Sequence, residues 1–93
     1  MNRWTITIYP SFHDQYAQLW VEHPDLRAVI RNFETDLRKH LPDLELYIER
    51  IADRPSPHLW SVPLPGLTVL IELLPEDRKL QFVWIKLPQN DPE

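Results

Sequence analysis

Alternation of apolar and polar residues predicts a β-strand over residues 4–9 of the chain. Trp4, Ile6 and Ile8 share one face of this strand, and the residues between them share the other. Pro10 lacks a backbone donor and should end the strand. The strand is therefore expected to be half-buried, with its tryptophan and isoleucines in the core.

Two helices are predicted to follow this strand. The first begins near Ser11, whose hydroxyl is suited to cap a helix that carries Asp14 three residues later, and it ends near His23. The second begins at Pro24. Both helices carry an apolar stripe, which consists of Phe12, Tyr16, Leu19 and Trp20 in the first and of Leu26, Val29, Ile30, Phe33, Leu37 and Leu41 in the second. Both stripes are expected to face the core.

Residues 44–52 fit two patterns. Leu44, Leu46 and Ile48 alternate as in a strand, whereas Tyr47 and Ile51, together with Leu44 and Ile48, recur at helical spacing. Prolines bound the segment on both sides, and they favour the strand. The pattern alone leaves the helix open.

Residues 66–88 predict a β-hairpin, in which two apolar runs flank a polar turn at 75–79. The first run is apolar on both faces, because Leu70 and Leu74 interrupt its polar face. A short strand should precede the hairpin. Since Pro63 and Pro65 remove two donors from one edge, this strand is expected to lie at the edge of the sheet or to stop at Val62.

The order of these elements predicts an α+β fold. We expect a two-layer sandwich with β-α-α-β-β-β order, in which two helices pack on one face of an antiparallel sheet. The 93 residues are sufficient for one domain, with a polar tail from about residue 88. The segment 44–57 or a loop could cover the second face of the sheet.

Composition narrows the functional classes. The chain has no cysteine, so thiolate metal sites and cysteine nucleophiles are excluded. The net charge is −4, and counting charged residues gives −1 for residues 1–43 and −3 for residues 44–93. A large nucleic-acid footprint is therefore disfavoured. No run is long and apolar enough for a signal peptide or a membrane span, and we expect a soluble cytoplasmic protein.

No residue pattern typical of an active site is present. The histidines are scattered, the serines lie in no nucleophile motif, and a single glycine excludes glycine-rich phosphate loops. We therefore predict no metal site and no cofactor, and we assign no catalytic residue. Three arginines on the second helix, Arg27, Arg31 and Arg38, are expected to form a solvated face with Glu34.

The last strand is expected to expose an apolar surface. Leu80, Phe82, Trp84 and Lys86 alternate with Gln81, Val83, Ile85 and Leu87, and only one of these faces can point at the helices. The other face would expose either Phe82 and Trp84 or Val83 and Ile85, which indicates a partner surface.

The segment "LWSVPLPGLTVLIELLPEDRKLQFVWIKL", preceded by a strand and two helices, resembles the RelE/ParE superfamily of toxins from toxin–antitoxin and plasmid-stabilisation systems. The opening "WTITIYPSF" also resembles the first strand and helix start of that family. The resemblance covers nearly the whole chain. It implies toxin activity, with either mRNA cleavage at the ribosome or binding of DNA gyrase, and a cognate antitoxin as partner.

The chain departs from this family at the basic positions that ribonuclease members use. Ser61, Pro63 and Thr68 stand at those positions in the hairpin, and Pro88 and Gln89 stand where a basic or histidine-containing segment often follows. Cleavage of RNA needs an acid or base and cations near the phosphorus centre. The resemblance therefore favours a toxin that binds protein.

Three functions remain open at this stage. The first is a RelE/ParE-like toxin that acts by protein–protein contact and is neutralised by an antitoxin segment. The second is a ribonuclease with atypical residues, for which Arg54, His58 and Lys86 are candidates. The third is a non-toxic interaction module, including a homodimer. The residues predicted to bind a partner are Thr68, Leu70, Glu72, Leu74, Phe82, Trp84 and Lys86.

Overall fold

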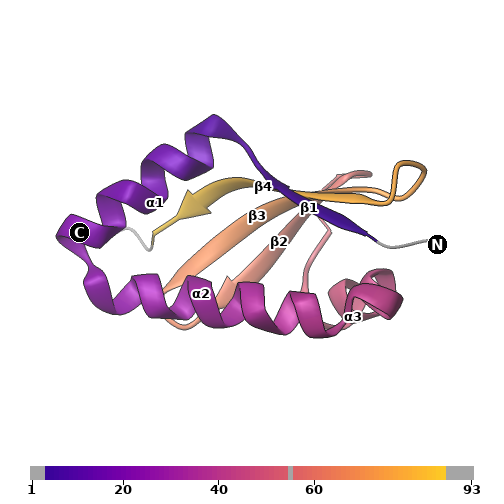
Figure 1. Ribbon diagram of the computed structural model, residues 1–93, viewed down its shortest axis with the longest axis horizontal. Coiled ribbons are helices and arrows are strands. Elements are labelled where there is room, and N and C mark those ends of the chain that lie inside the picture. The colour runs from indigo at the N-terminus through magenta and orange to yellow at the C-terminus, as the bar shows by residue number, and fades with distance from the viewer. Residues whose placement is uncertain (1–3, 55, 88–93) are drawn as a thin grey trace, which may run out of the picture.

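The computed structural model describes residues 4–54 and 56–87 and consists of a sheet and a layer of helices (Figure 1). The predicted two-layer α+β arrangement is confirmed. The predicted polar tail and the positions of Pro88 and Gln89 lie outside the described residues. The elements are β1 (Thr5–Ile8), α1 (Pro10–Glu22), α2 (Pro24–Lys39), the 3-10 helix η1 (Leu41–Asp43), α3 (Leu44–Ile51), β2 (Leu59–Leu64), β3 (Leu67–Leu74) and β4 (Lys79–Lys86).

The strands of the described residues form one sheet in the order β1-β4-β3-β2. β2, β3 and β4 pair antiparallel, as predicted, whereas β1 pairs parallel with β4 and so differs from the fully antiparallel prediction. Parallel neighbours need a long crossover connection, and the helices between β1 and β2 carry the chain across the sheet. The sheet is therefore mixed, with β4 and β3 at its centre.

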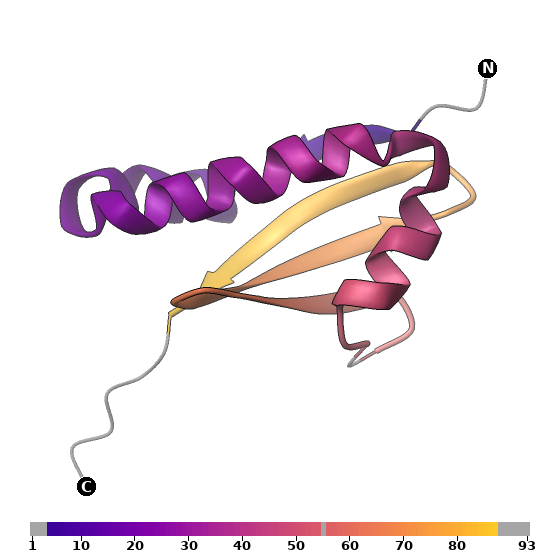
Figure 2. The same cartoon turned by 90° about the horizontal axis from the view of Figure 1, so that it is seen from below.

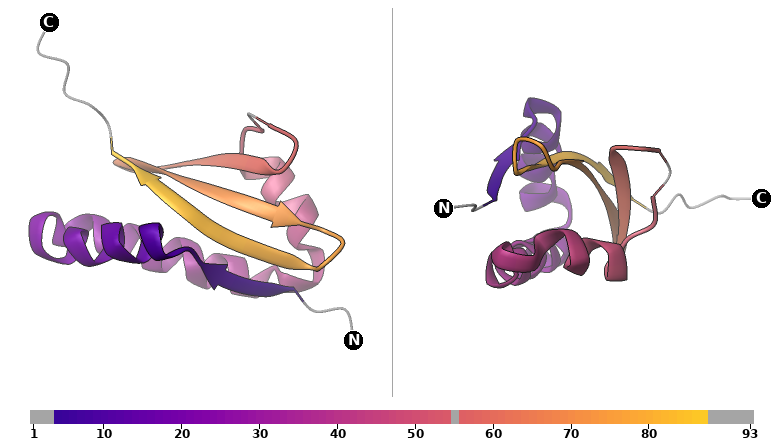
Figure 3. Two further views of the ribbon diagram at one scale, coloured as in Figure 1. Left: turned by 90° about the horizontal axis from the view of Figure 1, so that it is seen from above. Right: turned by 90° about the vertical axis from the view of Figure 1, so that its right-hand side faces the viewer.

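The core lies between the helices and one face of the sheet. Leu67, Val69, Ile71 and Leu73 alternate along β3 as buried residues and face the buried residues of α2 and α3. In Figures 2 and 3, α2 and α3 lie on one side of the sheet, and α1 runs beside β4. The helix side chains that complete this core are Phe12, Leu19, Ile30, Phe33, Leu37, Leu44 and Ile48.

Residues 44–51 form helix α3, so the expectation of a strand was wrong. Leu44 and Ile48, one turn apart, are fully buried, whereas Leu46 is 62% exposed. A strand would have placed all three on the same face. The proline before this segment lies in η1, which leads directly into α3 and therefore starts the helical segment instead of bounding a strand.

Three expectations for the first strand and helix were also wrong. Helix α1 begins at Pro10, and Ser11 does not cap it, because the Ser11 hydroxyl donates a hydrogen bond of 3.1 Å to the carbonyl oxygen of Val83. Trp20 is 51% exposed instead of buried, and the guanidinium of Arg27 lies 3.6 Å from the centroid of its ring. Ile8 is 50% exposed, since it ends the short edge strand β1.

β2 is an edge strand, as its prolines predicted, and it continues to Leu64 instead of stopping at Val62. Its outer edge is partly paired, because Asp53 and Ser61 exchange both backbone hydrogen bonds, at 2.8 and 2.6 Å. Pro63 lies on the same edge and offers no donor. This edge is therefore protected against pairing with another chain.

Candidate functional site

The sheet face opposite α2 and α3 carries most of the residues that were predicted to bind a partner. Along β3, Thr68, Leu70, Glu72 and Leu74 point away from the core and are half-buried. Trp84 and Lys86 of β4 lie beside them, in register with Leu70 and Thr68, respectively. We call these six residues, Thr68, Leu70, Glu72, Leu74, Trp84 and Lys86, the open face.

A β-bulge in β4 determines which residues belong to the open face. Leu70 pairs with Trp84 but the next residue, Ile71, pairs with Phe82, so Val83 has no partner in β3. The extra residue reverses the alternation along β4. Phe82 is consequently buried, with 1% of its surface exposed, while Trp84 is 45% exposed.

Phe82 is therefore a correction to the predicted partner surface. Its ring lies 5.0 Å from that of Phe12 and 6.0 Å from that of Phe33, between helix and sheet. In an unbroken strand, Ile85 would lie on the face opposite to Phe82, yet Ile85 is also buried. The exposed face of β4 was expected to hold either Phe82 and Trp84 or Val83 and Ile85. Neither alternative was right, because the bulge lets β4 bury both Phe82 and Ile85 while Trp84 stays exposed.

The segment after α2 does not cover the open face. Leu44 and Ile48 of α3 are buried among the helices, and Asp53 pairs with the edge of β2. The expectation that residues 44–57 cover the second face was therefore wrong for the described part of that segment. Figure 3 shows α3 on the side of the sheet that α2 also occupies.

Tyr9 crosses part of the open face and fixes the position of Glu72. Its hydroxyl donates a hydrogen bond of 2.9 Å to a carboxylate oxygen of Glu72. This hydrogen bond, then burial, then the negative charge of Glu72 raise the pKa of Tyr9 above its ordinary value of 10.0. The Glu72 carboxylate, which the sequence offered as a free partner contact, is thus already engaged within the chain.

One end of the open face is hollowed. A shallow cavity of about 480 Å³ lies between the β2–β3 turn and the end of β4. Ser61 and Thr68, which stand at basic positions of ribonuclease members in the resemblance, both line it. Among the described residues that line this hollow, Lys86 is the sole charged one. The lining residues are Ser61, Leu64, Gly66, Leu67, Thr68, Lys86 and Leu87.

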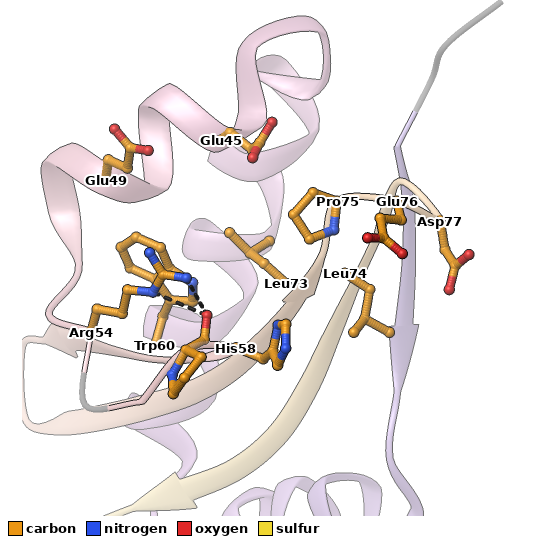
Figure 4. Close-up of a pocket in the computed structure, with 11 residues that line it drawn as sticks. Glu45, Glu49, Arg54, His58, Trp60, Leu73, Leu74, Pro75, Glu76 and Asp77 are labelled. Carbon is orange, nitrogen blue, oxygen red and sulfur yellow. Dashed lines mark hydrogen bonds between the residues drawn. The ribbon is translucent and has the colours of Figure 1, made fainter.

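A second cavity, of about 510 Å³, lies at the other end of the sheet, between α3 and the β3–β4 turn (Figure 4). We call it the acidic groove. Its lining residues are Glu45, Glu49, Arg54, Pro57, His58, Trp60, Leu73, Leu74, Pro75, Glu76 and Asp77. The open face and the acidic groove meet at Leu74, which belongs to both.

The three residues considered for ribonuclease chemistry do not come together. Arg54 and His58 line the acidic groove, whereas Lys86 lines the hollow at the opposite end of β3. The Nε and Nη2 atoms of Arg54 both donate to the carbonyl oxygen of Pro57, and its guanidinium lies 5.1 Å from the centroid of the Trp60 ring. Arg54 is thus held by the protein in a groove that four carboxylates also line, a poor setting for phosphate.

The acidic groove was not recognised from the sequence. Glu45 and Glu49 lie one turn apart on α3 and share one face of this helix. Trp60 of β2 points into the protein, with 8% of its surface exposed. The carboxylates of the β3–β4 turn were assigned to the turn alone.

Residues 4–54 and 56–87 contain neither a metal-binding cluster nor a membrane-spanning helix. No three histidine, aspartate or glutamate side chains of this part of the chain are placed to hold a metal ion. None of the helices described is both long and apolar enough to cross a membrane. On the second helix, Arg38 pairs with Glu34 at 3.0 Å, as expected for a solvated face.

Comparisons of the chain with protein-family models, with curated proteins and with solved structures found no match. Functional inference therefore rests on the geometry of the open face and the acidic groove.

Proposed function

We propose that this chain is a RelE/ParE-like toxin-type protein that acts by binding another polypeptide through the open face. One observation supports the proposal most directly: Trp84 is 45% exposed and lies opposite the half-buried Leu70 in register, on the sheet face away from α2 and α3. Tryptophan is enriched among the residues that dominate binding energy at protein interfaces, and Leu70 extends the exposed apolar patch around it.

The charges beside the open face favour a partner segment that is apolar and acidic. Lys79 and Lys86 point to the same side of β4 as the open face, and the carboxylate of Glu72 is engaged by Tyr9. An antitoxin segment laid across β3 and β4 would bury Trp84 and Leu70 and bring its carboxylates to the two lysines.

The separation of the cationic residues supports binding over RNA cleavage. A ribonuclease needs cations and an acid or base around one phosphorus centre. Here Arg54 and His58 lie in the acidic groove, and Lys86 lies at the far end of β3. The β-α-α order followed by a meander is compatible with both RelE-like and ParE-like members of the resembled family.

Induced expression in a bacterial host, with mRNA cleavage mapped in the same culture, tests this function. We expect growth arrest without ribosome-associated cleavage. Trp84→Ala should relieve the arrest, whereas Trp20→Ala should not, although it removes another half-exposed tryptophan. Because both variants lose the same side chain, the difference between them isolates the open face.

Three results would contradict the proposal. Arrest with mapped cleavage would favour the ribonuclease, and absence of arrest would favour the non-toxic module. Equal relief by Trp84→Ala and Trp20→Ala would mean that the open face has no special role. Measuring the mass of the purified protein in solution would show whether a homodimer occupies the open face instead.

A further inference from the structure

The acidic groove has the shape of a binding site separate from the open face. Its volume of about 510 Å³ lies in the range typical of ligand pockets. Figure 4 shows Glu45 and Glu49 on α3 at one side and Glu76 and Asp77 on the β3–β4 turn at the other. Trp60 and Leu73 lie between them but are nearly buried, so the apolar surface open to a ligand comes from Leu74 and Pro75.

The lining of the acidic groove carries a net negative charge. Four carboxylates and one guanidinium line it, which leaves a formal charge of −3 with histidine counted as neutral. The ion pairs found among the described residues include none of these four carboxylates. Glu45 and Glu49 are also like charges one helical turn apart, which repel each other. A cation between α3 and the turn would relieve this repulsion.

The floor of the groove selects the kind of cation. Trp60 is buried, and Pro57, Leu73 and Pro75 add apolar surface to the lining. A small hydrated metal ion gains little from such a floor, whereas a lysine or arginine side chain places its methylene stem there and its charge at the rim. Arg54 already lies over the ring of Trp60, so an incoming side chain meets the apolar surface of Leu74 and Pro75.

From these features we propose that the acidic groove binds a lysine or arginine side chain of a partner polypeptide. The stem packs on Leu74 and Pro75, and the cationic head lies between the carboxylates of α3 and those of the turn. The proposal rests on the proposed function only in that the side chain belongs to a partner polypeptide. Since Leu74 borders both sites, one extended segment can occupy the groove and the open face together.

An NMR titration of the isotope-labelled protein tests the proposal directly. The probe is the peptide acetyl-Ala-Leu-Arg-Leu-Ala-amide, and its control has citrulline, the neutral isostere, in place of arginine. We expect the arginine peptide to shift the amide signals of residues 45–49 and 73–77, and the citrulline peptide to leave them unchanged. Raising the salt concentration should weaken the binding.

A charge-matched pair of variants isolates the groove. Glu45→Gln with Glu49→Gln removes two carboxylates from α3 and should weaken the arginine peptide about tenfold. Glu22→Gln with Asp25→Asn makes the same change in net charge near the α1–α2 junction, and should weaken it less than about twofold. Circular dichroism and thermal melting confirm that both double variants are folded.

Several outcomes would overturn the proposal. These are equal binding of the citrulline peptide, equal weakening by both double variants, or shifts confined to residues 68–72 and 84–86 of the sheet. Spermidine that binds the groove as tightly as the peptide would identify a free organic cation as the ligand instead. Retained toxicity in Trp84→Ala with intact peptide binding would contradict the proposed function alone, so the two failures are distinguishable.

Discussion

Beyond the end of β1, the side chain of Gln15 bonds to the edge of β4 in place of a neighbouring strand. Its Nε2 donates to the carbonyl oxygen of Ile85 at 2.8 Å, and its Oε1 accepts from the amide of Ile85 at 2.7 Å. A side-chain amide thus makes the two hydrogen bonds that a backbone residue of an adjacent strand would make. Together with the hydroxyl of Ser11 on Val83, it satisfies the part of the β4 edge that β1 does not reach.

Gln15→Leu should lower the free energy of unfolding by about 1–3 kcal/mol, because it leaves the backbone amide and carbonyl of Ile85 without partners in a half-buried position. Gln18→Leu is the matched control. Gln18 is exposed and bonds only to Glu22, so its replacement should change stability by less than about 0.5 kcal/mol. Urea unfolding of both variants measures the difference, and equal losses would show that the edge contact contributes nothing.

The Tyr9 and Glu72 pair should make stability depend on pH in the alkaline range. The pKa of Tyr9 is raised in the folded state, chiefly by the hydrogen bond to Glu72, so folding favours the protonated phenol. The stabilisation is complete below the unfolded pKa of about 10 and is lost as the pH rises through the higher folded pKa.

A double-mutant cycle of Tyr9→Phe and Glu72→Gln checks this dependence. We expect the coupling energy to be constant between about pH 7 and pH 9 and to fall above about pH 10. Glu72→Gln alone should lower the pKa of Tyr9 towards 10.0 in a spectrophotometric titration. A coupling energy that does not change over this range would contradict the hydrogen bond as its source.

At the scale of elements, the sequence predicted those whose patterns are local. The β3–β4 hairpin follows from two apolar runs around a polar turn. β3 ends at Leu74, as expected, whereas β4 begins at Lys79, which the predicted turn included. Helix α2 follows from its long apolar stripe and Pro24. β3 is apolar on both sides because Leu70 and Leu74 lie half-buried on the open face.

The elements that sequence reasoning missed depend on distant partners. Val83 resembles its neighbours in size and hydrophobicity, so nothing local marks the bulge, which exists only in register with β3. The segment 44–51 matched helix and strand equally, and the place available to Leu44 and Ile48 in the core decided between them. Of the residues predicted to lie exposed on β3 and β4, Phe82 therefore faces the core instead.

For the whole molecule, the two layers divide the residues that hold the fold from those available to partners. Ile48 of α3 is fully buried between the helices and the sheet, whereas Leu70 is half-buried on the open face. Both are single apolar side chains of similar size. If this division is correct, truncating them should have different consequences for stability.

Ile48→Ala should lower the free energy of unfolding by about 2–5 kcal/mol, because it opens a cavity in the closed core. Leu70→Ala should cost about 1 kcal/mol, because its side chain already faces solvent in part and leaves no enclosed cavity. Urea unfolding gives both values. An unchanged dependence on urea in Ile48→Ala would show that α3 unfolds together with the sheet. A small loss with a weaker urea dependence would instead mean that α3 separates before the sheet unfolds, and the acidic groove would then lack a rigid wall.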